Sequence, residues 1–105
     1  MTVIFNTDSN INGRKELSIP VIALIKEQLD RYSNLITRVE VHLSDENSHK
    51  EGPNDKRCLL EARIEGRQPI AVACNANSYD QSISGAIEKL LASLDKILGR
   101  LKNHQ

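Results

Sequence analysis

The sequence predicts a small α+β fold in which a strand, a helix, three strands and a second helix follow one another. Three observations support this order. Four segments alternate apolar and polar residues or are rich in β-forming residues, two segments carry apolar residues at helical spacing, and polar turn-forming clusters separate them. Because each strand has one apolar face, both helices are expected to cover the same face of a four-stranded sheet.

The first strand and the first helix are expected within the N-terminal third of the chain. Residues 2–7, TVIFNT, are rich in β-forming side chains, and a polar cluster then turns the chain. A helix is expected from about residue 18 to 34, with Ser18 as N-cap and Pro20 in the first turn. Its apolar stripe consists of Val21, Ile22, Leu24, Ile25, Leu29 and Tyr32.

The second strand is expected at residues 37–43, where Val39, Val41 and Leu43 alternate with polar residues. Residues 44–55 include Gly52 and Pro53 among charged residues, a composition typical of a loop.

Two further strands are expected to form a hairpin. Residues 57–65 and 70–76 both alternate, and the chain turns around Gly66. The register that places both apolar faces on one side pairs Ala62 with Ile70, Leu60 with Val72, and Cys58 with Cys74.

The last helix has the clearest pattern. Asn77 or Ser78 is expected to cap it, and Asp80 suits its positive N-terminal end. Its apolar stripe comprises Ile83, Ile87, Leu90, Leu94, Ile97 and Leu101. Leu91 and Leu98 widen this apolar face, which could therefore serve a partner or a weak homodimer.

Composition indicates one soluble domain over residues 1–105, with an aliphatic core because the chain has only three aromatic residues. Two cysteines, the lack of a signal-like N-terminus, and the lack of an apolar run near 20 residues favour a reduced, cytoplasmic protein without a membrane segment. Formal net charge is zero, which argues against simple nonspecific nucleic-acid binding. The last ten residues nevertheless include Lys96, Arg100 and Lys102 and no acid.

No pattern in the sequence indicates catalysis. Nucleophile, phosphate-loop, dinucleotide and metalloprotease motifs are absent, so no catalytic residue, enzyme activity or cofactor is predicted. Four potential metal ligands lie within one short stretch, but we interpret that stretch as a solvated loop and predict no metal site; they are His42, Asp45, Glu46 and His49. We interpret Cys58 and Cys74 as small core residues and not as a disulfide.

Basic residues on the helices offer the remaining candidate site. Lys89, Lys96 and Arg100 are spaced by seven and four residues, which places them on nearly one stripe. Lys26 and Arg31 belong to the first helix, and Arg38 follows it. These cations fit either a solvated face or a concave basic ridge that contacts RNA phosphates. A continuous ridge would favour RNA, whereas a mosaic of charges would favour a protein partner.

Three blocks of the sequence resemble a known family. ITRVEVHLSDEN at residues 36–47, DKRCLLEARIEG at 55–66 and SISGAIEKLLASLDKILGRLK at 82–102 are similar to the ribosome hibernation-promoting factors, a family that includes the ribosome-associated inhibitors and the sigma-54 modulation proteins. The resemblance covers nearly the whole chain, and the expected element order is that of the family.

The resemblance implies a fold like that of a double-stranded-RNA-binding domain. It also implies binding to ribosomal RNA in the decoding and tRNA region of the small subunit, with inhibition of translation when growth slows. By position, it assigns RNA contacts to Lys89, Lys96, Arg100 and Lys102, with Lys26, Arg31 and Arg38 as secondary candidates. The alternative function is a protein-interaction module of the same fold without a ribosome role.

Overall fold

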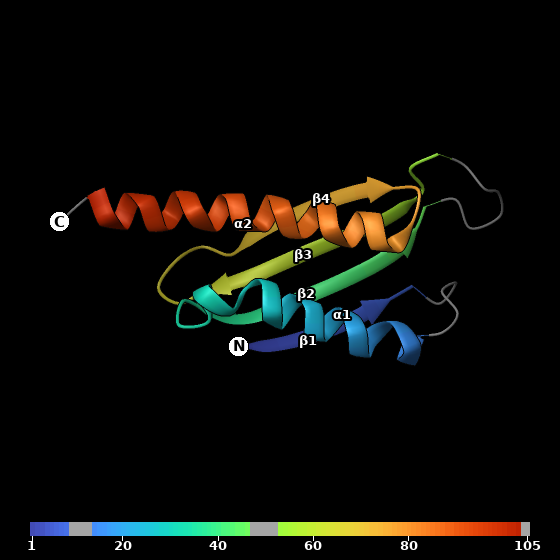
Figure 1. The fold of residues 1–105 in the computed structure, drawn as a ribbon, viewed down its shortest axis with the longest axis horizontal. Coiled ribbons are helices and arrows are strands. Elements are labelled where there is room, and N and C mark those ends of the chain that lie inside the picture. Colours follow the sequence, from blue (N-terminus) through green and yellow to red (C-terminus); the bar gives the residue numbers. More distant parts are fainter. Residues whose placement is uncertain (9–13, 47–52, 104–105) are drawn as a thin grey trace.

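A computed structural model describes residues 1–8, 14–46 and 53–103, and among these the side chains of residues 14–15 and 98–103 lie outside the description. Six main elements and one short 3₁₀ helix follow one another (Figure 1): β1 (Thr2–Thr7), α1 (Arg14–Gln28), η1 (Asp30–Tyr32), β2 (Ile36–Asp45), β3 (Lys56–Ile64), β4 (Ile70–Ala76) and α2 (Tyr79–Asn103). The predicted α+β class and the β-α-β-β-β-α order are confirmed.

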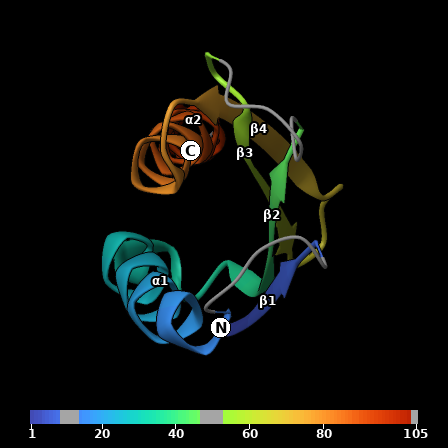
Figure 2. The same ribbon diagram turned by 90° about the vertical axis from the view of Figure 1, so that its right-hand side faces the viewer.

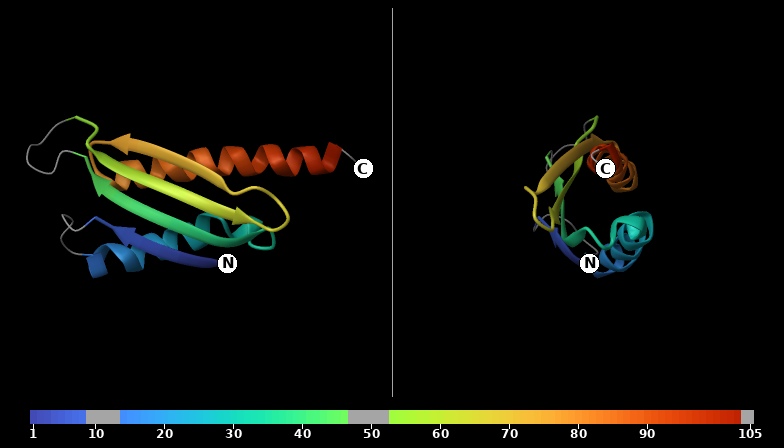
Figure 3. Two further views of the ribbon diagram at one scale, coloured as in Figure 1. Left: turned by 180° about the vertical axis from the view of Figure 1, so that it is seen from behind. Right: turned by 90° about the vertical axis from the view of Figure 1, so that its left-hand side faces the viewer.

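The four strands form one mixed sheet in the order β1-β2-β3-β4. β1 runs parallel to β2, and the other neighbours are antiparallel. Parallel neighbours need a crossover connection, and α1 supplies it. Figure 2 shows both helices on one face of the curved sheet, with α1 beside β1 and α2 over β3 and β4. The view from behind in Figure 3 shows the other face of the sheet without a helix over it.

The core lies between the sheet and the helices, and it is mainly aliphatic, as composition predicted. Phe5 and Tyr32 are the aromatic members among the described residues. The buried apolar residues are Phe5, Val21, Ile25, Leu29, Tyr32, Ile36, Val39, Val41, Leu43, Cys58, Leu60, Ala62, Ile64, Ile83, Ala86, Ile87, Leu90 and Leu94. From the edge strand β4, Ile70, Val72 and Cys74 pack against this core while remaining half-buried.

The predicted hairpin register is confirmed at each of its three pairs. Ala62 lies opposite Ile70, Leu60 opposite Val72, and Cys58 opposite Cys74. Gly66 adopts a positive φ of 72° in the turn, a conformation that a residue without a side chain adopts easily.

The prediction for the first helix was wrong at its start. α1 begins at Arg14, so Ser18 lies inside the helix and Pro20 lies beyond the first turn. The added turn brings Leu17 against the core. Burial of Leu17 therefore favours helix upstream of the proline, although Pro20 cannot donate the usual backbone hydrogen bond.

The end of the first helix is also tighter than predicted. α1 ends at Gln28, and the 3₁₀ helix η1 continues the chain to Tyr32. Leu29 and Tyr32 remain almost fully buried, because a short 3₁₀ turn keeps both side chains on the core side. The apolar stripe was thus predicted correctly even where the helix type changes.

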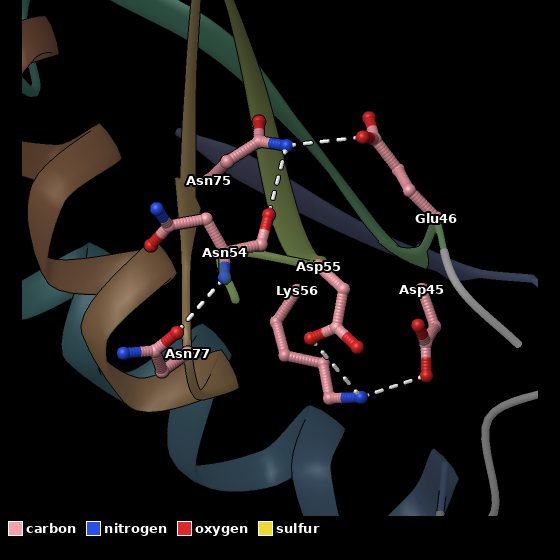
Figure 4. Close-up of polar contacts among 7 residues, drawn as sticks. All are labelled: Asp45, Glu46, Asn54, Asp55, Lys56, Asn75 and Asn77. Carbon is pink, nitrogen blue, oxygen red and sulfur yellow. Dashed lines mark hydrogen bonds and ion pairs between the residues drawn. The ribbon is translucent and has the colours of Figure 1, made fainter. Parts of the chain in front are cut away.

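Polar contacts join the start of α2 to the loop end of the sheet. The side-chain oxygen of Ser78 accepts a 3.1 Å hydrogen bond from the Gln81 amide, so Ser78 is the N-cap. Asn77 has another role, because its side-chain oxygen accepts a 2.8 Å hydrogen bond from the backbone N–H of Asn54 (Figure 4). Asn54 has a positive φ of 57°, which asparagine tolerates better than most residues.

Lys56 connects two strands at the same end of the sheet (Figure 4). Its Nζ donates to Asp45 Oδ2 at 2.7 Å and lies 3.6 Å from Asp55 Oδ1. The ammonium also lies 5.7 Å from the centre of the Tyr79 ring. The hydrogen bond to Asp45 raises the pKa of the Lys56 ammonium above its ordinary value. Lys56 thus joins β2, β3 and the first turn of α2.

A close approach between α2 and β4 occurs at Gly85. A Cβ at this position would collide with the Cys74 sulfur and lie 3.3 Å from the Cys74 Cβ. Gly85 is therefore required for the observed distance between α2 and the sheet, despite the low helix propensity of glycine.

We expect Gly85→Ala to destabilise the fold by about 1–2 kcal/mol, because overpacking outweighs the gain in helix propensity. In a Cys74→Ala background the obstructing sulfur is absent and only the 3.3 Å contact between the two Cβ atoms remains, so the same change should cost at least about 1 kcal/mol less. Urea unfolding of the four proteins in this cycle measures both effects. An effect of Gly85→Ala that is the same in both backgrounds would contradict the proposed contact.

Burial raises the pKa of the Cys58 thiol from 9.0 to about 12, with a smaller contribution from Cys74. Between these values the unfolded chain loses the thiol proton while the folded chain keeps it. Stability should therefore fall as pH rises from 9 to 12, by up to about 1.4 kcal/mol per pH unit from this group.

A Cys58→Ala variant separates this effect from the titration of Lys56 and Tyr79, whose raised pKa values act in the same direction. The variant should unfold more easily near neutral pH because it leaves a cavity. The difference in free energy of unfolding between the variant and the parent protein should shrink at alkaline pH, because only the parent protein loses the contribution of the protonated Cys58 thiol. Chemical unfolding at several pH values tests this expectation, and a constant deficit would disprove it.

Candidate functional site

Lys26 of α1 and Lys89 of α2 lie on flanks of the two helices that face away from each other, and not on a common ridge. On α1, the side that faces α2 includes Leu17, Leu24 and Gln28, which line hollows shared with α2. Lys26 is exposed, and its position two residues from both Leu24 and Gln28 turns it away from α2.

Lys89 lies on the opposite flank of α2, beside the edge strand. Its Nζ donates a 2.7 Å hydrogen bond to the backbone carbonyl of Ala73 in β4. Lys96 follows seven residues later, which is nearly two turns of helix, and it is also exposed, so both lysines lie on the β4 side of α2. The structure thus brings together Lys89 and Lys96, but it separates them from Lys26.

Arg31 is held by contacts inside the protein. Its guanidinium forms an ion pair with Asp95 of α2 and lies 4.7 Å from the centre of the Tyr32 ring. Both partners of the ion pair remain largely exposed, at 63% and 52% for the side chains of Arg31 and Asp95. Such exposed pairs contribute only about 0–1 kcal/mol. Arg31 therefore bridges η1 and α2 through a contact that another anion could replace.

Arg38 lies on the face of the sheet that no helix covers. It lies directly opposite Arg63 of β3, and its nearest ion-pair partner is Glu40, at 4.0 Å. Within the described part of the chain its buried Nε atom has no hydrogen-bond partner. The next row of this face pairs Glu40 with Glu61. Rows of like charge therefore alternate here, and this face is a mosaic.

Arg100 and Lys102 belong to α2, but their side chains lie outside the described residues. Their predicted role in RNA binding stays a prediction.

The space between the helices is apolar with an acidic border. Two neighbouring hollows of about 190 and 200 Å³ open there, and both are lined by Leu24 and Ser84. The full lining consists of Leu17, Pro20, Val21, Leu24 and Gln28 from α1, and Asp80, Ile83, Ser84, Ile87, Glu88 and Leu91 from α2. Among the described residues of this lining, Asp80 and Glu88 are the charged ones, and both are acidic. The concave surface between the helices therefore differs from the predicted basic ridge.

The four potential metal ligands do not converge where they are described. His42 is exposed on the uncovered face, while Asp45 binds Lys56 on the helix side. Glu46 accepts a 3.1 Å hydrogen bond from Asn75, and His49 lies outside the described residues. Across residues 1–8, 14–46 and 53–103, no three His, Cys, Asp or Glu side chains form a group suited to a metal ion.

Two features near the hairpin escaped the sequence prediction. The first is Arg63, which lies opposite Arg38 on the uncovered face of the sheet. The alternation of residues 57–65 was the signal that could have identified its position. An open hollow of about 760 Å³ also lies between the hairpin turn and α2, lined by Gly66, Arg67, Gln68 and Ile97. This hollow depends on how α2 passes the turn, which local sequence patterns do not reveal.

No helix within the described residues is long and apolar enough to cross a membrane.

Comparison with solved structures finds the same fold in two proteins. A ribosomal subunit interface protein from Coxiella burnetii matches with a TM-score of 0.71 and 13% identity, over 94% of this chain and 99% of the other. The N-terminal domain of Thermus thermophilus Protein Y matches with a TM-score of 0.71 and 16% identity, over 92% and 99%. Identities this low show the fold alone. A search of curated protein sequences found no match.

Comparison with family models gives a match to the family described as sigma 54 modulation protein / S30EA ribosomal protein, and it spans residues 9–102. This confirms the resemblance seen in the three sequence blocks. The match covers most of the chain, including both helices and β2 to β4. The protein therefore belongs to the sigma 54 modulation protein / S30EA ribosomal protein family, a family of ribosome-associated factors.

Proposed function

We propose that this protein binds the ribosome in the cytoplasm and keeps it inactive, at the decoding and tRNA region of the small subunit. The observation that carries the proposal is the family match over residues 9–102. The shared fold with a ribosomal subunit interface protein supports it. On this proposal the protein acts by occupying a site and catalyses no reaction.

We propose that ribosomal RNA is contacted by Lys89 and Lys96 on the β4 flank of α2, and by Arg100 and Lys102 farther along the same helix. Lys89 donates one hydrogen bond to the Ala73 carbonyl, which leaves two of its three N–H donors for a phosphate. Lys26, Arg31 and Arg38 are secondary candidates. Arg31 would exchange its exposed ion pair with Asp95 for a phosphate. Contact with four to six phosphates would give a slope of log K against log salt of roughly −3 to −5.

The alternative function is a protein-interaction module without a ribosome role. The mosaic of charges on the uncovered face of the sheet and the half-buried Leu91 between the helices favour this alternative. Pull-down from cells with and without nuclease separates the two functions. Partners that disappear after nuclease treatment support ribosome binding, whereas partners that persist support the alternative.

Lys96→Glu should weaken co-sedimentation with small ribosomal subunits and make its salt slope shallower by about one unit, since one phosphate contact is lost. Arg57→Glu is the matched control, because it makes the same change in charge at the other end of β3, away from Arg38. Equal weakening by both variants would contradict a contact localised to α2. Absence of co-sedimentation of the parent protein at low salt would contradict ribosome binding itself.

Occupation of the decoding and tRNA region predicts competition with tRNA. Increasing amounts of the protein should displace labelled tRNA from small subunits programmed with messenger RNA, and Lys96→Glu should need a higher concentration for the same displacement. If the protein binds and tRNA stays in place, the binding site is elsewhere on the ribosome, and the proposed location is wrong.

A further inference from the structure

The groove between the helices is the feature that the proposed RNA contact leaves unused. We define this inter-helix groove by the two neighbouring hollows described above, which share Leu24 and Ser84. α1 and α2 touch each other only slightly, since each packs mainly on the sheet. Apolar side chains of both helices therefore remain partly exposed in the groove, because the helices do not pack closely against each other.

The charge of the groove excludes RNA as its natural ligand. Asp80 and Glu88 line it, and none of the basic side chains that the structure describes does so. Glu27 is exposed and follows the lining residue Pro20 by seven residues, so it lies on nearly the same side of α1. Phosphates would be repelled by these carboxylates, whereas lysine and arginine side chains would be attracted.

The division of the groove into two small hollows favours successive side chains over one compact small molecule. Each hollow measures about 190 to 200 Å³, below the roughly 300 Å³ at which small-molecule sites usually begin. Two small apolar hollows in a row resemble the grooves that take successive anchor residues of an amphipathic segment. Ser84 and Gln28 add polar groups that could fix its orientation.

We propose that the inter-helix groove binds a basic amphipathic protein segment, with apolar anchors in the two hollows and lysine or arginine beside Asp80 and Glu88. The lining of the two hollows and their acidic border are what select this partner. The proposal does not depend on the ribosome: it concerns a different surface from the Lys89 and Lys96 flank, and the purified protein suffices to test it.

The test is a titration of the isotope-labelled protein, followed by NMR, with a synthetic amphipathic peptide of leucine and lysine. A matched peptide of leucine and glutamate is the control for apolar contact alone. The lysine peptide should shift the amide signals of α1 and α2 around Leu24 and Ser84, while the glutamate peptide should bind at least about tenfold more weakly. Shifts confined to other surfaces would overturn the proposal.

Protein variants make the test specific. Glu88→Lys should weaken binding of the lysine peptide about tenfold, and Leu24→Gln should do the same by removing the apolar side chain shared by both hollows. Glu61→Lys makes the same change in charge as Glu88→Lys, on the opposite face of the sheet, and should leave binding unchanged. Circular dichroism melting confirms that each variant folds.

Three results would refute the proposed site. Equal weakening by Glu88→Lys and Glu61→Lys would indicate attraction to net charge only. Concentration-dependent self-association that Leu24→Gln abolishes would assign the groove to a second copy of the chain. Binding of the glutamate peptide as tightly as the lysine peptide would remove the argument from charge.

Discussion

The contact between Gly85 and Cys74 fixes how α2 sits on the sheet, and the surface of the molecule depends on it. Cys74 faces the helices only because the β3–β4 register places it opposite Cys58, and a slip of one residue would turn it to the other face. The absence of a side chain at Gly85 lets the helix approach at that point and at that rotation. Once this rotation is set, the direction of each exposed side chain of α2 is determined by helical geometry.

That rotation divides the charges of α2 between two flanks. Lys89 and Lys96 lie beside β4, whereas Glu88 and Asp95 lie toward α1, where Glu88 borders the groove and Asp95 pairs with Arg31. A chain of zero net charge therefore still presents surfaces of different character. The total charge of the chain, which argued against nucleic-acid binding, says little about what any one of these surfaces attracts.

Local patterns predicted the fold well because each rests on a periodicity that burial enforces. The alternation in β2 to β4 gave both the strands and the hairpin register, and the apolar stripe of α1 was right even through η1. The start of α1 was missed because Pro20 suggested a first turn, whereas packing of Leu17 on the core extends the helix upstream. The arrangement of the candidate site was less predictable. Lys26 and Lys89 were both correctly expected on helix surfaces, but only tertiary packing decides that they face away from each other.

The separation of basic and acidic surfaces determines which components of a ribosome each surface could contact. A ribosome offers phosphates and also positively charged protein segments, so a uniformly basic surface would match only one of them. If both proposals hold, the β4 flank of α2 contacts RNA while the inter-helix groove takes a basic segment, and the two surfaces can act together because they lie on opposite sides of one helix. Two linked contacts of modest strength can give higher affinity than either alone when the geometry allows both. Neutral net charge is then compatible with specific binding, because repulsion by Asp80 and Glu88 would also oppose docking of RNA in the wrong orientation.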